Sequence, residues 1–143
     1  MSKNNRHNAR ALALALALCL PAAGALARQA PMVEPGRELL VSASAPASAP
    51  QTGENVRRAV VQGASRHDWH VKEDTPGRLT LEYVKGSHQV VVDVDYDAQG
   101  YQIKYRESSD MNYELEDGRR YIHPNYNKWI ANLGAAIRQA NAR

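Results

Sequence analysis

The sequence predicts an α+β domain: a two-layer sandwich in which a four-stranded antiparallel meander carries an N-terminal and a C-terminal helix on one face (α-β-β-β-β-α). Three observations predict it. Apolar and polar residues alternate over 69–105, as in half-buried strands. Turn residues interrupt the alternation at spacings that keep the apolar faces together. Apolar residues recur at helical spacing on both sides of this stretch.

The meander is centred on residues 78–106, RLTLEYVKGSHQVVVDVDYDAQGYQIKYR. Three strands place apolar side chains on one face: Leu79, Leu81, Tyr83, Val90, Val92, Val94, Tyr96, Tyr101, Ile103 and Tyr105. Keeping these faces together sets Leu81 opposite Val92, and Val92 opposite Tyr105. We expect this register because a slip of one residue would move every apolar side chain to the other face.

The turns agree with that register. Gly86-Ser87 is a two-residue loop, and its glycine suits a type II′ turn because the first loop position needs φ > 0. The next loop is Asp97-Ala98-Gln99-Gly100, in which we expect Gly100 to be left-handed.

The first of the four strands of the meander precedes this stretch, over residues 69–73, with Pro76-Gly77 as the turn that follows it. Its alternation directs Trp69 and Val71 inward, and matching the apolar faces sets Trp69 opposite Tyr83 and Val71 opposite Leu81. His70 then points to the open face. We do not expect it to bind a metal, because no second ligand has suitable spacing.

The second face of the meander is polar. Two carboxylates each lie between residues of neighbouring strands: Asp93 between Thr80 and Lys104, and Asp95 between Arg78 and Gln102. Opposite charges on neighbouring strands contribute about 0.2–1 kcal/mol per pair. We interpret these charges as a solvated sheet face rather than the paired carboxylates of a catalytic site.

Two helices flank the strands. Thr52 is a candidate N-cap for the first, which should end near Arg66 or His67 and bury Val56, Ala59, Val60, Gly63 and Ala64. Gly63 would weaken this helix unless it allows close packing. Pro124 suits the first turn of the second helix, whose apolar stripe is Tyr126, Trp129, Ile130, Leu133, Ala136, Ile137 and Ala140. Trp129 is the expected anchor of this helix on the sheet.

The N-terminus has the features of an export signal. A basic region precedes the apolar run Ala11 to Leu20, and Ala25-Leu26-Ala27 fits a small-residue cleavage site. We therefore expect a signal peptide over 1–27, a flexible Ala/Pro/Ser-rich linker over 28–51 and a single domain over 52–143. Within the linker, Arg37 to Val41 is a candidate for a short strand at a sheet edge.

The net charge and the position of the single cysteine limit the classes of function that we expect. The three basic residues of the leader account for the whole net charge, so the mature chain is formally neutral and nucleic-acid binding is not expected. The single cysteine, Cys19, lies in the leader. We expect a soluble periplasmic protein, with a membrane-anchored lipoprotein as the alternative if Cys19 is lipidated; Leu18 before it is a poor lipidation context. We expect no cofactor.

A polar segment follows the strands, and Asp117-Gly118 within it signals a turn. Its candidate binding residues flank the start of the last helix: Ser108, Ser109, Asp110, Asn112, Tyr121, His123, Asn125 and Asn127. They could form a shallow groove for a ligand or a partner's loop, because helix N-termini favour anions and carbonyl oxygens. Alternatively, they cap the helix and satisfy the loop backbone. A Ser–His–Asp hydrolase is disfavoured because there is no nucleophile elbow.

The motif YRESSDMNYE followed by YIHPNYNKWIANLGAAI resembles a group of small exported proteins and lipoproteins of Gram-negative bacteria without an established activity. The resemblance spans about Val56 to Ile137, with its most specific part at Ile122 to Leu133. It implies the same α-β-β-β-β-α domain and no catalytic residue. We therefore expect a non-catalytic periplasmic protein-interaction module. The alternative is a small-molecule or anion binder that uses Ser108–Asn112 and Tyr121–Asn127.

Overall fold

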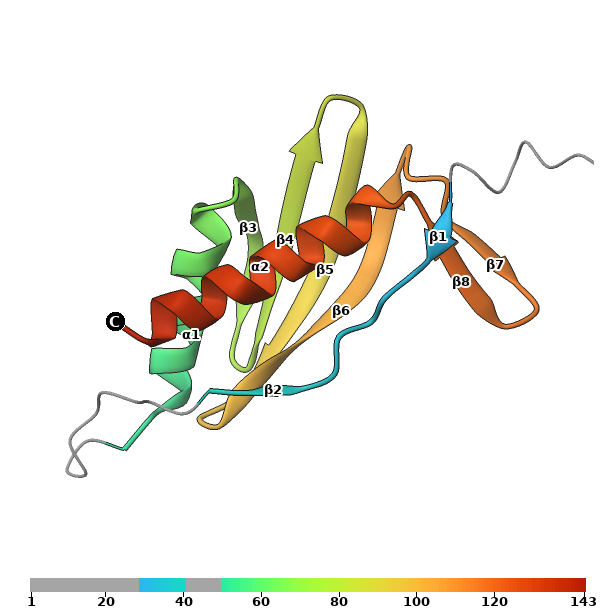
Figure 1. Cartoon of the computed structure of the whole chain (residues 1–143). Coiled ribbons are helices and arrows are strands. Elements are labelled where there is room, and N and C mark those ends of the chain that lie inside the picture. The colour runs from blue at the N-terminus through green and yellow to red at the C-terminus, as the bar shows by residue number, and fades with distance from the viewer. Residues whose placement is uncertain (1–28, 41–49) are drawn as a thin grey trace, which may run out of the picture.

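A sheet and two helices form the body of the protein in a computed structural model that describes residues 29–40 and 50–143 (Figure 1). The sheet contains β3 (Trp69–Thr75), β4 (Arg78–Lys85), β5 (His88–Tyr96), β6 (Gly100–Ser109) and β2 (Glu38–Leu39), in the order β2-β6-β5-β4-β3. Helices α1 (Gly53–Ser65) and α2 (Asn125–Asn141) cover one of its faces. The α+β class with an antiparallel sheet and two helices is confirmed.

The detail differs from the single four-stranded sheet that we expected. Strands β1 (Ala30–Pro31), β8 (Arg119–Ile122) and β7 (Glu114–Glu116) form a second antiparallel sheet, in the order β1-β8-β7. The N-terminal segment, residues 29–40, supplies one strand to each sheet. The candidate edge strand near 37–41 is therefore present, as β2, whereas β1 and the β7–β8 hairpin were not expected.

The register of the meander is confirmed. Leu81 lies opposite Val92, Val92 opposite Tyr105, and Trp69 opposite Tyr83. Gly86 has a φ of 63° and Ser87 is not left-handed, as a type II′ turn requires.

Two register shifts interrupt the ladders. One lies between Val71 and Glu73 on β3; the other lies between Val91 and Val92 on β5, opposite Arg106. The second shift moves the residues after Tyr105 out of alternation, although β6 continues to Ser109. The loss of pattern after Tyr105 therefore marks a β-bulge rather than the end of the strand.

Gly100 is not left-handed, contrary to our expectation. Its role is to allow close approach: a Cβ atom there would lie 2.0 Å from the backbone oxygen of Glu38. The amide of Leu40 donates to the carbonyl of Gln99 at 2.9 Å and holds the same segment. A glycine is thus required where β2 crosses onto the start of β6.

Helix α1 agrees with the sequence. The Thr52 hydroxyl accepts from the amide of Asn55 at 3.3 Å, and the helix ends at Ser65. Its buried residues are the ones expected: Val56, Ala59, Val60, Gly63 and Ala64. Gly63 permits close contact with α2, because a Cβ there would lie 2.6 Å from the backbone nitrogen of Ile137.

Two expectations about buried side chains were wrong. Trp129 is only partly buried at the rim of the core, and α2 is anchored instead by Tyr126, Ile130, Leu133 and Ile137. Val71 is 42 % exposed. On β3, which is an edge strand of the sheet, only the first residue, Trp69, is buried. Within residues 29–40 and 50–143, no helix combines the length and the apolar character needed to cross a membrane.

Candidate functional site

The predicted site residues lie where β6 ends and α2 begins, a region that we call the β6–α2 junction. After Ser109 the chain turns through Asp110 and Asn112, both left-handed with φ of 54° and 49°. It then runs through the β7–β8 hairpin and returns to α2 at His123. Asp and Asn tolerate left-handed backbone better than other non-glycine residues, so the sequence suits this tight turn.

The first half of the predicted set makes mostly internal bonds. The Ser108 hydroxyl lies 2.9 Å from the hydroxyl of Tyr105. His88 Nδ1 lies 2.7 Å from the carbonyl oxygen of Asp110 and must be the donor, because a carbonyl only accepts. The carbonyl of Asn112 accepts from the side chain of Gln29 at 2.9 Å. Ser109 is exposed at the end of β6.

The second half organises the start of α2. His123 Nδ1 accepts from the amide of Asn125 at 3.2 Å, and the His123 amide donates to the carbonyl of Met111 at 2.7 Å. Asn127 holds the N-terminal segment, accepting from the Val33 amide at 2.9 Å and donating to the Pro31 carbonyl at 3.0 Å. Tyr121 pairs within the small sheet.

The structure thus brings part of the set together. Asp110 and His123 meet around His88, whose ring centroid lies 5.1 Å from that of His123. Asn112 and Asn127 instead bond to the N-terminal segment. Within the described residues, neither Ser108 nor Ser109 bonds to His123, and no group of three or more His, Cys, Asp or Glu could hold a metal ion.

A row of aromatic rings leads from the junction along the rim of the helix layer. The centroids of His88 and Trp129 are 6.4 Å apart, those of Trp129 and Tyr83 are 4.7 Å apart, and those of Tyr83 and Trp69 are 5.3 Å apart. This row was not predicted from the sequence. The predicted pairing of Trp69 with Tyr83 was the available signal, but nothing local placed Trp129 beside them.

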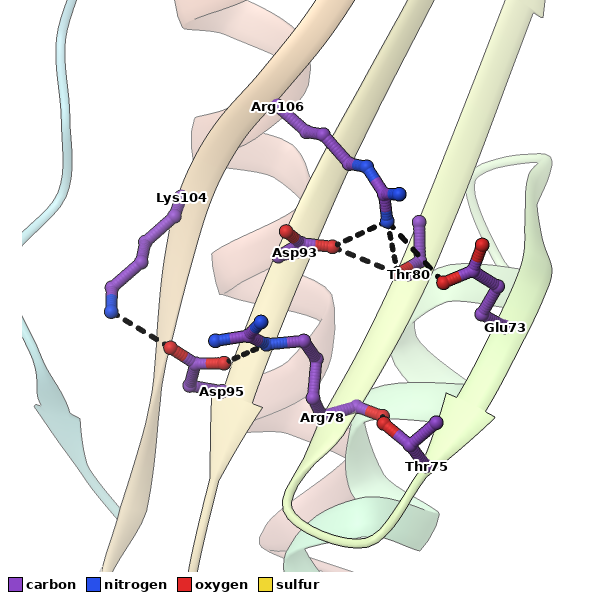
Figure 2. Close-up of polar contacts among 8 residues, drawn as sticks. All are labelled: Glu73, Thr75, Arg78, Thr80, Asp93, Asp95, Lys104 and Arg106. Atoms are coloured by element: carbon purple, nitrogen blue, oxygen red, sulfur yellow. Dashed lines mark hydrogen bonds and ion pairs between the residues drawn. The ribbon is translucent and has the colours of Figure 1, made fainter.

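The open face of the large sheet carries a network of ion pairs (Figure 2). Asp95 accepts from Arg78 at 2.5 Å and from Lys104 at 2.7 Å. The Arg78 hydrogen bond is the main reason that the pKa of Asp95 lies below its ordinary value. The side chains bind one another, which agrees with a solvated sheet face.

Arg106 closes the other half of this network (Figure 2). From its place in the bulge, its guanidinium reaches the Thr80 hydroxyl at 3.1 Å and a carboxylate oxygen of Asp93 at 3.4 Å. It also bonds to Glu73 at 3.3 Å. Thr80 is only 2 % exposed and donates to Asp93 at 2.8 Å. The bulge therefore positions a cation over a polar residue that would otherwise face solvent.

Comparison of the chain with protein-family models, curated proteins and solved structures finds no match.

Proposed function

We propose that this chain is an exported, non-catalytic interaction module of the cell envelope that binds another protein. The basic and apolar leader with its Ala25-Leu26-Ala27 site supports export. The resemblance of its two motifs to small exported proteins of Gram-negative bacteria supports an envelope location.

The observation that supports a protein partner is the β7–β8 hairpin, which projects from the body of the molecule (Figure 1). Leu115 on β7 is 63 % exposed and Tyr113 beside it is 41 % exposed. Strand β7 is at the edge of its sheet, so within the described residues its outer side has no strand partner. Exposed apolar side chains on a free strand edge favour recognition by strand addition.

The base of the hairpin is held firmly enough to present this edge. Tyr113 stacks on Tyr105 of β6, with ring centroids 4.9 Å apart and planes 11° apart. Arg120 of β8 forms an ion pair with Glu34, and its carbonyl accepts from the amide of Met32 at 2.8 Å. The N-terminal segment therefore braces β8, while β7 stays open to a partner.

The test is photo-crosslinking in a Gram-negative host that expresses the full chain with its own leader. We expect the protein in the periplasmic fraction, with its N-terminus at Arg28. A photoreactive residue in place of Leu115 should yield a discrete crosslinked protein, because that side chain would lie in the interface. Leu39, which is 67 % exposed on β2, is the matched control position and should not yield this product.

Identical products from both positions, or none from position 115, would contradict the proposed interface. Retention of the unprocessed chain in the cytoplasm would contradict export.

A further inference from the structure

A shallow hollow of about 110 Å³ lies where the α1–β3 turn meets β4 and α2, at one end of the aromatic row. We call it the turn hollow. Its lining combines aromatic rings with polar side chains: Arg66, His67, Asp68, Trp69, Tyr83, Trp129 and Asn132.

Two aromatic rings form a corner in this hollow. Tyr83 and Trp129 are both partly buried, with ring centroids 4.7 Å apart and planes inclined at 53°. Trp69, which is 3 % exposed, packs against Tyr83 with ring centroids 5.3 Å apart. Because the rings are inclined, a ligand can lie on one ring with its edge against the other. A flat base sandwiched between parallel rings would not fit this geometry.

Three polar side chains around this corner have no polar partner among the described residues. Arg66, Asp68 and Asn132 are exposed, and within the described residues their side chains make no hydrogen bond or ion pair. Asp68 adopts a left-handed backbone with φ of 58°. Asp tolerates this conformation better than most non-glycine residues, and here it lies in the turn that joins α1 to β3.

A larger pocket shows the opposite arrangement. It measures about 240 Å³ and lies beneath the N-terminal segment, against α2 and β6. Its carboxylate, Glu38, accepts from the hydroxyl of Tyr101 at 3.0 Å and from Arg138 at 2.7 and 2.8 Å. These polar groups satisfy one another, so the turn hollow is the better candidate for a polar ligand.

We propose that the turn hollow binds a neutral saccharide. The C–H face of a sugar ring is apolar and would pack on Tyr83 or Trp129, while its hydroxyls would bond to Arg66, Asp68 and Asn132. The lining includes both a guanidinium, Arg66, and a carboxylate, Asp68, so the site does not select a polyanion. The aromatic row continues to His88 and His123, which gives a longer oligosaccharide further rings to contact.

Tryptophan fluorescence titration of the purified mature chain tests this site, with soluble tetramers of N-acetylglucosamine and of glucose as probes. We expect saturable binding of at least one tetramer, and tighter binding than that of its monosaccharide because of the aromatic row. The double variant Arg66→Ala with Asn132→Ala should bind at least tenfold more weakly. Both residues are exposed and unpaired, so this variant should unfold at the same temperature as the parent chain.

Arg58→Ala is the matched control, because Arg58 is an exposed arginine of α1 outside the hollow. Its affinity should be unchanged. Failure of both tetramers to bind, or equal loss of affinity in the control and the double variant, would overturn the saccharide site. The outcome is independent of crosslinking at Leu115, so either proposal can fail while the other stands.

Discussion

Two core tyrosines differ in whether their hydroxyl groups have partners. Tyr101 and Tyr126 are each 1 % exposed. Burial raises the pKa of both hydroxyls, so both stay protonated and can donate. The Tyr101 hydroxyl bonds to Glu38 at 3.0 Å and to the carbonyl of Gly134 at 3.3 Å. The Tyr126 hydroxyl has no hydrogen-bond partner within the described residues.

Removing each hydroxyl should therefore have opposite effects. Tyr101→Phe should lower the free energy of unfolding by about 1–2 kcal/mol, because it leaves polar atoms without their partner. Tyr126→Phe should leave the free energy unchanged or raise it by up to about 1 kcal/mol, since it removes a buried unpaired polar group. Urea unfolding measures both, and a larger loss for Tyr126→Phe than for Tyr101→Phe would refute this assignment.

At the scale of elements, the N-terminal segment crosses tightly onto the large sheet at β2. Strand β2 pairs Glu38 with Tyr101 and Leu39 with Gly100. Beyond these pairs, Arg138 on α2 binds the Glu38 carboxylate. The segment thus links the sheet and α2, although only two of its residues form this strand.

Gly100→Ala should release this crossing. The new Cβ would collide with the backbone of Glu38, and such overpacking typically costs about 1–3 kcal/mol. Hydrogen exchange at the amide of Leu40 should accelerate more than exchange in β4 or β5. Gly36→Ala is the control, because nothing lies within 4 Å of a Cβ there. Equal exchange at Leu40 in the two variants would count against the tight crossing.

At the scale of the whole molecule, carboxylates in ion pairs make the free energy of unfolding depend on pH. Neighbouring cations hold the pKa values of four carboxylates below their ordinary values: Arg57 for Asp74, Lys72 for Glu82, Arg78 for Asp95 and Arg37 for Asp97. Each lowered pKa contributes stability that is present above the ordinary pKa of about 4 and is lost as the pH falls through the lowered value. The protein should therefore lose stability below about pH 4.

Asp95→Asn tests this dependence. The variant should be less stable than the parent chain at pH 7. The difference should shrink as the pH falls from about 4 through the lowered pKa of Asp95, below which this carboxyl is protonated in the folded and the unfolded chain alike. Asp117→Asn, at the exposed turn of the β7–β8 hairpin, is the control and should show no such trend. The unfolding temperatures of both variants, measured between about pH 2 and pH 7, test this dependence, because this range contains the pKa values of the carboxylates. A constant difference for Asp95→Asn would show that its ion pairs do not contribute.

The sequence by itself determined the four-strand register, the Gly86 turn and the buried face of α1. These features are local: alternation marks the apolar face, and a two-residue loop leaves one register that keeps apolar faces together. It also supplied the candidate site residues, because the turn and the start of α2 are rich in Ser, Asp and Asn. Their bonds to His88 and to the N-terminal segment could not be predicted, since each joins positions far apart in the chain.

Only the tertiary structure decided what lies over each face and edge. Strands β1 and β2 are two residues each and too short to carry a periodic pattern. They become strands because β8 and β6 offer them free backbone groups. The corner of Tyr83 and Trp129 likewise exists because α2 crosses β4. The physical reason is that periodicity records which side of a segment avoids water, whereas packing against distant segments decides what covers that side.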